Sequence, residues 1–229
     1  GRIDALPDAA AADVILVLAE DGTGTGLFAV SRSSPGLEVI PQDGVDPTRK
    51  RSRVTFEDVR ARRVAAAMPP EAVDALVDDV LIAAAADALG AAQAVMDLVV
   101  DYAKLRRQFG QPIGAFQAVQ HLCVDMYETV ELACAGVVHA LWAADAAAPD
   151  ERHLAAVRAK AFAGRLASVA DTAIQVFGGV GYTWEHDAHL YVKRLLGWCA
   201  YLGGVDRYLR EAGTRLVCAV RRERNEDHR

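Results

Sequence analysis

The run from Pro70 to Phe109 constrains the fold more than any other part of the sequence. It is rich in alanine and contains no proline after Pro70, and Glu71 follows that proline, as is typical of the first turn of a helix. Its larger apolar side chains are spaced along the run at Leu76, Leu81, Leu89, Val95 and Val99. We therefore predict one long helix that ends at Phe109. The segment 110–114, which contains Pro112 between two glycines, predicts a turn directly after it.

The remainder of the second half of the chain also has helical periodicity. Apolar residues recur at alternating spacings of three and four from Gly114 to Ala147, and again from Glu151 to Phe177. A shorter helix is predicted from Ala188 to Trp198, and a last one from Val205 to Arg222. Long helices joined by short loops predict an up-and-down four-helix bundle.

Residues 1–66 have the composition of β structure. Short apolar runs separated by Gly, Pro and Ser predict strands over residues 14–18, 27–30, 37–40 and 53–56. The run at 14–18 is apolar throughout, which predicts a buried strand. These strands form a small antiparallel sheet or part of a larger one. The chain begins at Gly1 rather than at methionine, so we expect further sequence upstream.

The predicted fold class is α+β, mostly α. A partial antiparallel β-domain is predicted for residues 1–66, a helical bundle for residues 67–223 and a polar tail for residues 224–229. The sequence does not alternate between strands and helices, which disfavours a doubly wound parallel sheet.

Charge and cysteine content narrow the possible partners and compartments. The net charge of −6 disfavours non-specific binding to nucleic acids or anionic membranes. No apolar run reaches about 18 residues, so no membrane span is predicted. The four cysteines include no CxxC pair and no signal peptide is visible, and both observations favour reduced thiols in a cytoplasmic protein.

The stretch from Arg106 to Gln120 carries the clearest candidate binding chemistry. Its arginines, aromatic rings and glutamines suit an anionic ligand with a flat ring system, although a solvated loop with ordinary caps has the same composition. A second candidate is the glycine-rich segment 178–181. It follows a helix rather than a strand, which favours a helix end over a dinucleotide-binding loop. Gln175, on an otherwise apolar stripe, keeps a binding role open there.

Two histidines, His186 and His189, lie among carboxylates in a third candidate segment. A metal site needs further ligands, and no third histidine or cysteine is near. Helix capping by Glu185 or Asp187 is therefore favoured, and no metal is predicted.

Residues 102–113, Tyr-Ala-Lys-Leu-Arg-Arg-Gln-Phe-Gly-Gln-Pro-Ile, closely resemble a segment of the acyl-CoA dehydrogenases. The other matching segments, in the family's order and spacing, are Phe116-Gln117, Ala159-Lys160 and residues 175–183. The resemblance is strongest over residues 75–210, which correspond to the C-terminal half of the family. Residues 1–66 are similar to the later part of the family's middle β-domain.

This resemblance implies an oligomeric flavoprotein, homomeric or heteromeric, that binds FAD and catalyses α,β-dehydrogenation of an acyl-CoA thioester. An electron-transfer flavoprotein is the implied electron acceptor. Arg106 matches the family arginine that contacts the FAD of a neighbouring subunit. The implied FAD-binding residues are Arg106, Gln108, Phe109, Gln117, Gln175, Gly178 and Gly179.

The sequence departs from the family where the catalytic base is expected. The family glutamate lies in a Tyr-Glu-Gly-Thr motif, and the matching residues are Tyr201, Leu202, Gly203 and Gly204. An alternate base position, on the first bundle helix, aligns with Val80. Neither side chain accepts a proton, and loss of a positioned base costs ~10²–10⁴-fold in rate or more. The family's Arg-Asp pair before the glutamate is replaced by Lys193 and Arg194.

The leading hypothesis is a subunit of a heteromeric acyl-CoA dehydrogenase that contributes FAD contacts while a related chain supplies the base. A second hypothesis is a self-sufficient flavin oxidoreductase of the same fold, with Asp79 or Asp206 as the substitute base. Helical geometry turns neighbouring residues by roughly 100°, which points Asp79 away from the alternate position at Val80. A third hypothesis is a structural or regulatory homologue without catalysis.

Overall fold

A computed structural model of the 229-residue chain describes residues 1–65 and 67–226, without the side chains of residue 163 and residues 219–226. The chain divides into two compact units, Gly1–Asp74 and Ala75–Arg229. The sequence predicts a domain boundary between residues 66 and 67, and that boundary stays a prediction.

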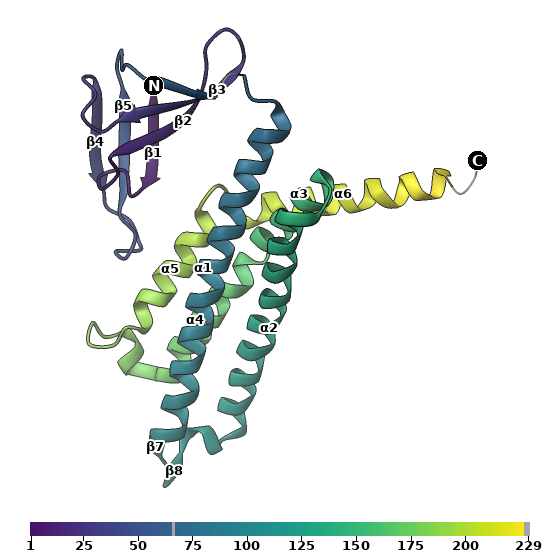
Figure 1. Ribbon diagram of the computed structural model, residues 1–229. Helices are drawn as coiled ribbons and strands as arrows, with labels where there is room; N and C mark the ends of the chain where they lie inside the picture. The colour runs from purple at the N-terminus through teal and green to yellow at the C-terminus, as the bar shows by residue number, and fades with distance from the viewer. Residues whose placement is uncertain (66, 227–229) are drawn as a thin grey trace. The chain divides into compact units, whose positions relative to one another are not determined.

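The first unit consists of two three-stranded antiparallel sheets, in the orders β1-β5-β4 and β2-β3-β6 (Figure 1). The strands are β1 (Arg2–Pro7), β2 (Val14–Glu20), β3 (Thr25–Ser31), β4 (Leu37–Gln42), β5 (Arg51–Phe56) and β6 (Arg62–Ala65). A small hydrophobic core contains Ala9, Ile15 and Val54. The α+β class, mostly α, is confirmed.

The four strands predicted for the first unit are confirmed as β2 to β5, whereas β1 and β6 were not predicted. β1 carries two charged side chains and ends in Pro7, and β6 is only four residues long, so neither has a clear period-two pattern. The prediction that β2 is buried was wrong for one of its faces. Ile15 is 5% exposed, but its neighbour Leu16 is 60% exposed, because this unit covers only one side of the strand.

The second unit is helical. Its long helices are α1 (Pro70–Leu105), α2 (Gln117–Ala146), α3 (Pro149–Ala161), α4 (Ala163–Phe177), α5 (Ala188–Ala200) and α6 (Val205–Glu226). Shorter elements are β7 (Arg107–Gln108), β8 (Gln111–Pro112), and the 3₁₀ turns η1 (Ile113–Ala115) and η2 (Gly178–Tyr182). Helices α1, α2, α4 and α5 run side by side as a bundle, and α6 extends away from it (Figure 1). Among the described residues, no helix is both long and apolar enough to cross a membrane.

The bundle core is built largely from small side chains. On α1 the buried face includes Leu81, Ala85, Ala88, Ala92, Val95 and Val99. Because small side chains project little from a helix surface, helices can approach closely, as α4 does to α5 and α2 does to α4. α1 packs on the same core through its side chains. The partners that fill this core include Met126 and Val130 on α2 and Leu166 and Val169 on α4.

Several predicted helix ends were wrong. α1 stops at Leu105 rather than Phe109, because Arg107 and Gln108 pair with Pro112 and Gln111 in a short antiparallel hairpin. At its tip Phe109 and Gly110 have φ angles of 52° and 81°, which are incompatible with a right-handed helix. α2 begins at Gln117 rather than Gly114, because η1 precedes it.

The helix predicted from Glu151 to Phe177 is two helices, α3 and α4, separated at Phe162. Gly164, a poor helix former, follows this break. The last helix, α6, continues through Glu226 rather than ending at Arg222, whereas the polar tail at residues 224–229 stays a prediction. Residues 227–229 of that tail lie outside the described residues.

The packing of the core predicts that two leucines of α1 contribute very differently to the free energy of unfolding. Leu81 is 1% exposed and Leu98 is 41% exposed. We expect Leu81→Ala to lower the free energy of unfolding by about 2–5 kcal/mol, because it leaves a cavity among helices that cannot collapse freely. Urea denaturation followed by circular dichroism measures this change. Leu98→Ala is the matched control, and a loss as large as that of Leu81→Ala would contradict the assigned core.

Candidate functional site

Tyr102 joins two of the sequence-predicted segments at one end of the bundle. Its ring lies 5.0 Å from the ring of Phe177, and its hydroxyl lies 3.5 Å from the Phe177 carbonyl oxygen. Tyr102 is about one turn before Arg106 on α1, and Phe177 directly precedes Gly178. We call this region the hairpin end, which comprises residues 106–117 and residues 175–181. The contact between Tyr102 and Phe177 brings the segment with Arg106, Gln108, Phe109 and Gln117 and the segment with Gln175, Gly178 and Gly179 to the same end of the helical unit. The hairpin of β7 and β8 marks that end in Figure 1.

The side chains of the hairpin turn face solvent. The Arg106 side chain is exposed and has no hydrogen bond or ion pair within residues 1–65 and 67–226. The neighbouring Arg107 instead donates from Nη2 to the Gly110 carbonyl at 3.1 Å. Phe109 is 91% exposed, and its ring meets only the edge of the Phe116 ring at 6.1 Å between centroids. An unpartnered guanidinium and a bare aromatic ring are thus presented together.

A shallow hollow of about 530 Å³ lies beside this turn. It is lined mainly by apolar atoms from α1, η1 and α2, with Lys104 and Gln120 among its polar contributors. Gln120 is engaged locally, because its Nε2 donates to the Gly114 carbonyl at 2.9 Å. Gly114 has no room for a side chain there, since a Cβ would lie 3.0 Å from the Ala103 carbonyl oxygen.

The glycine segment ends α4 and leaves its backbone open. Gly178 has φ and ψ angles of 66° and −142°, a backbone conformation that is essentially restricted to glycine, and the helix ends there. A Cβ added at Gly178 or Gly179 would meet nothing within 4 Å. Gly181, in contrast, is packed so that a Cβ would lie 3.0 Å from the Phe177 side chain. The segment is therefore both a helix end and an accessible stretch of backbone.

The histidine segment before α5 supports the start of that helix, but not through the side chains of Glu185 or Asp187 that were predicted to do so. The α5 amide of Ala188 donates to His186 Nδ1 at 3.1 Å, so His186 supplies the hydrogen bond expected from Glu185 or Asp187. The His186 ring also packs on Phe177 at 4.3 Å, which places the start of α5 at the hairpin end. Among the described residues, no group of three or more His, Cys, Asp or Glu side chains could hold a metal ion.

The two positions where the resemblance implies a base, Val80 and Leu202, both lie toward the opposite end of the bundle. Arg194 on α5 donates to both carboxylate oxygens of Asp87 on α1, at 3.1 Å and 2.5 Å. Because α5 runs back along α1 from the hairpin end, Val80 and Leu202 each lie about two turns beyond this pair in the same direction. They are 42% and 41% exposed, and both are apolar. We call this region the Leu202 end, which comprises Val80 and residues 201–204.

Helix α1 separates the two ends by a large distance. Val80 and Arg106 are 26 residues apart, which corresponds to about 39 Å along a helix axis. The structure therefore places the predicted FAD-binding residues and the predicted base positions in different regions of the same unit.

The turn at Leu202 is held by a buried polar arrangement that the sequence did not predict. Tyr208 donates from its hydroxyl to the Leu202 carbonyl at 2.7 Å. Lys160, which is fully buried, donates from Nζ to the Trp198 carbonyl at 2.5 Å and lies 3.9 Å from the centre of the Trp198 ring. Burial lowers the pKa of Lys160 to about 8. The sequence contained Lys160 only as part of the resemblance to the family, and its partners are 38 and more residues away.

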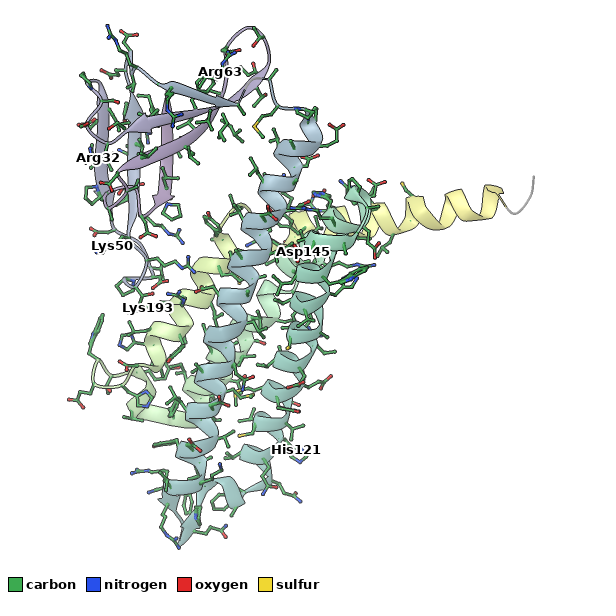
Figure 2. All side chains as sticks on the ribbon, in the orientation of Figure 1. Arg32, Lys50, Arg63, His121, Asp145 and Lys193 are labelled. Carbon is green, nitrogen blue, oxygen red and sulfur yellow. The ribbon has the colours of Figure 1, made fainter. Side chains whose placement is uncertain are left out.

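The substitute bases considered from the sequence differ in their surroundings. Asp79 accepts a hydrogen bond from Arg152 Nη2 at 2.5 Å, so its carboxylate is already engaged within the helical unit. Asp206 lies exposed in the first turn of α6. Lys193, which replaces part of the family's Arg-Asp pair, places Nζ 4.3 Å from the centre of the Trp184 ring (Figure 2).

Residues 81–215 match the family of the acyl-CoA dehydrogenase C-terminal domain. The chain belongs to the acyl-CoA dehydrogenase family. Members of this family bind FAD, and a neighbouring structure, a glutaryl-CoA dehydrogenase from Mycobacterium smegmatis, was solved in complex with FADH2.

Relatives in sequence and structure agree with this assignment. Acyl-CoA dehydrogenase FadE34 of Mycobacterium tuberculosis is 45% identical over 141 residues, which is 60% of this chain and 20% of that protein. Acyl-CoA dehydrogenase IpdE2 of the same organism is 38% identical over 157 residues, 69% of this chain and 45% of that protein. The chain thus spans less than half the length of these relatives.

Solved structures extend the similarity to nearly the whole chain. The Tcur3481-Tcur3483 steroid ACAD, solved as a variant, superposes with a TM-score of 0.86 at 29% identity, covering 96% of this chain and 59% of that one. The ChsE4-ChsE5 complex from Mycobacterium tuberculosis has a TM-score of 0.86 at 26% identity, covering 95% and 59%.

The buried ammonium of Lys160 predicts a pH-dependent contribution to stability. With a folded-state pKa near 8 and an ordinary value of 10.5, the unfolded chain binds more protons between these two pH values. The free energy of unfolding contributed by this group therefore rises with pH from about 8 to 10.5. We expect urea midpoints of Lys160→Met to lack this rise. Lys104→Met, at an exposed position, is the control, and an equal loss there would contradict the assignment.

Proposed function

We propose that this chain is an FAD-binding subunit of a hetero-oligomeric acyl-CoA dehydrogenase. In this proposal it contributes cofactor contacts to α,β-dehydrogenation of an acyl-CoA thioester, and a related subunit supplies the base. The observation that carries the proposal is the contrast between the two ends of the helical unit. The hairpin end presents an unpartnered arginine beside an exposed phenylalanine, whereas neither Val80 nor Leu202 at the other end can accept a proton.

The hairpin end fits FAD by its chemistry. A guanidinium forms paired hydrogen bonds with a diphosphate, and Arg106 has no competing partner within the described part of the chain. Phe109 offers a flat apolar surface, and its side chain is 91% exposed. The open backbone at Gly178 and Gly179 allows a ligand to approach without meeting a Cβ. Gln108, Gln117 and Gln175 are exposed polar side chains in the same two segments.

The separation of about 39 Å between Val80 and Arg106 supports an arrangement in which two chains contribute to each FAD site. One arginine side chain cannot reach a reaction centre at the other end of α1. The hairpin end therefore serves a different cofactor molecule from the one whose substrate would lie at the Leu202 end. A chain without a base can still contribute to catalysis in this arrangement, because a neighbouring chain completes the cleft that its hairpin end touches. The ChsE4-ChsE5 neighbour is itself a complex of two chains.

The side chains of this chain determine which steps of the reaction it can assist and which steps need the related subunit. FAD, when bound, accepts the hydride that leaves the β-carbon of the thioester. This chain's Arg106 binds and orients the diphosphate, and Phe109 shields a ring from water. The α-proton needs a carboxylate from the related subunit, because Leu202 holds no ionisable group. An electron-transfer flavoprotein is the proposed electron acceptor.

The test is co-expression with a glutamate-bearing homologue, followed by visible spectroscopy of the purified complex. We expect a flavin spectrum in the complex that an acyl-CoA thioester bleaches. A stable, fully active homo-oligomer would contradict the proposal, and loss of that activity in Asp206→Asn would establish a self-sufficient enzyme. A colourless complex would instead favour a structural or regulatory role.

The two adjacent arginines of the hairpin provide a matched comparison. We expect Arg106→Ala to weaken FAD binding by the complex roughly 10- to 100-fold, since it removes charge-assisted hydrogen bonds to the diphosphate. Arg107→Ala leaves affinity nearly unchanged, because Arg107 already bonds to Gly110. Equilibrium binding of FAD, followed by quenching of flavin fluorescence, measures both. Equal losses in the two variants would point to a general effect on the hairpin.

A further inference from the structure

His153 joins three helices of the second unit. From its place on α3, its Nδ1 lies 2.8 Å from Oδ1 of Asp78 on α1, and its Nε2 lies 2.8 Å from Oε1 of Glu211 on α6. Asp78 is buried, with a side chain that is 2% exposed, and the His153 side chain is 18% exposed. The imidazole therefore bridges two carboxylates that come from helices at distant points in the sequence.

This geometry requires a particular protonation state. A neutral imidazole carries one N–H, so one of its two nitrogens would direct a lone pair at a carboxylate oxygen only 2.8 Å away. A doubly protonated ring donates to both carboxylates at once. With both carboxylates ionised, the two contacts are made together only when His153 is an imidazolium.

The surrounding charges are consistent with that state. Arg215 on α6 lies 3.3 Å from the same Glu211 carboxylate. Its positive charge disfavours a charged His153, whereas its ion pair with Glu211 holds that carboxylate in position. Arg152, the neighbour of His153 on α3, is directed to Asp79 on α1. Two acids thus face the imidazole directly, and one arginine shares one of them.

Glu211 and Tyr208 lie about one turn apart on α6, and Tyr208 holds the Leu202 carbonyl at 2.7 Å. The contact between His153 and Glu211, which fixes the first turns of α6, therefore also fixes the Leu202 turn that precedes the helix. We propose that protonated His153 is a latch that holds α6 against α1 and α3 and so keeps the Leu202 turn in place. This inference requires neither FAD nor a partner subunit, and its tests are independent of the proposed function.

The direction of the pH dependence follows from the contacts. Burial alone favours the neutral ring, but the hydrogen bonds to Glu211 and Asp78 outweigh it and raise the pKa of His153 above its ordinary value. A raised folded-state pKa contributes stability that is fully present below the unfolded value of about 6.5 and is lost as pH rises through the folded value. The latch therefore weakens above neutral pH.

The first test compares His153→Gln with His121→Gln. His121 lies on α2, is exposed and is labelled in Figure 2, which makes it a matched histidine outside the latch. We expect His153→Gln to lower the melting temperature by roughly 5 °C at pH 6 and by less than half as much at pH 9. His121→Gln changes neither value. A loss in His153→Gln that is equal at both pH values would overturn the proposal.

The second test measures the protonation state of His153 directly, and it applies even if His153→Gln does not fold. Nuclear magnetic resonance of ¹⁵N-histidine in the wild-type chain reports whether both ring nitrogens carry protons at pH 6.5. We expect both to be protonated, and we expect Glu211→Gln to shift the titration of His153 to lower pH. A neutral ring at pH 6.5, or a titration unchanged in Glu211→Gln, would overturn the proposal.

The link to the Leu202 turn has its own measurement. Hydrogen exchange of the peptide that spans residues 196–210 is compared in wild type, Glu211→Gln and Tyr208→Phe. We expect both variants to accelerate exchange at least several-fold in this peptide at pH 6.5, while peptides from α2 are unchanged. Protection in Glu211→Gln that equals wild type would show that the latch does not reach the turn.

Discussion

The length and the small-residue face of α1 are the constraint on which the helical unit depends. Its buried residues pack on the core of the other helices through their side chains, and its 36 residues span the whole bundle. The same helix therefore carries the hairpin with Arg106 at its C-terminal end and Val80 near its N-terminal end. A shorter or kinked α1 would bring these two chemistries together. Its unbroken length keeps them apart and makes a role for two chains physically reasonable.

Charged residues on α1 determine how the other helices are arranged around this core. Asp78 meets His153 on α3, Asp79 meets Arg152 on α3, and Asp87 meets Arg194 on α5. Partly buried ion pairs add little net stability, but removal of one partner leaves a charge without compensation. Such pairs therefore disfavour alternative registers more than they deepen the native state. An alanine-rich helix surface is otherwise nearly uniform along its length, so these acids supply the positional information that small apolar side chains cannot.

Sequence periodicity predicted the helices of the bundle because a buried stripe of spacing three and four depends only on local geometry. The hairpin at Arg107 and Gln108 was missed, since its pairing with Gln111 and Pro112 depends on the left-handed backbone at Phe109. The contacts of His153 were also beyond prediction, because its two partners are 75 and 58 residues away. The absence of a carboxylate at Leu202 could be read from the sequence only through the family resemblance, and the residues that hold that turn could not.

The two ends of the bundle share an unusual backbone feature. Phe109 and Leu202 both have positive φ angles, of 52° and 57°, although neither is glycine. This conformation costs an ordinary residue roughly 1–2 kcal/mol, and Phe109, which is 91% exposed, gains almost no burial within the unit to offset it. Glycine at either position would remove the strain. At Phe109 this strain is not offset by burial within the helical unit, and the proposed contact with a cofactor would offset it.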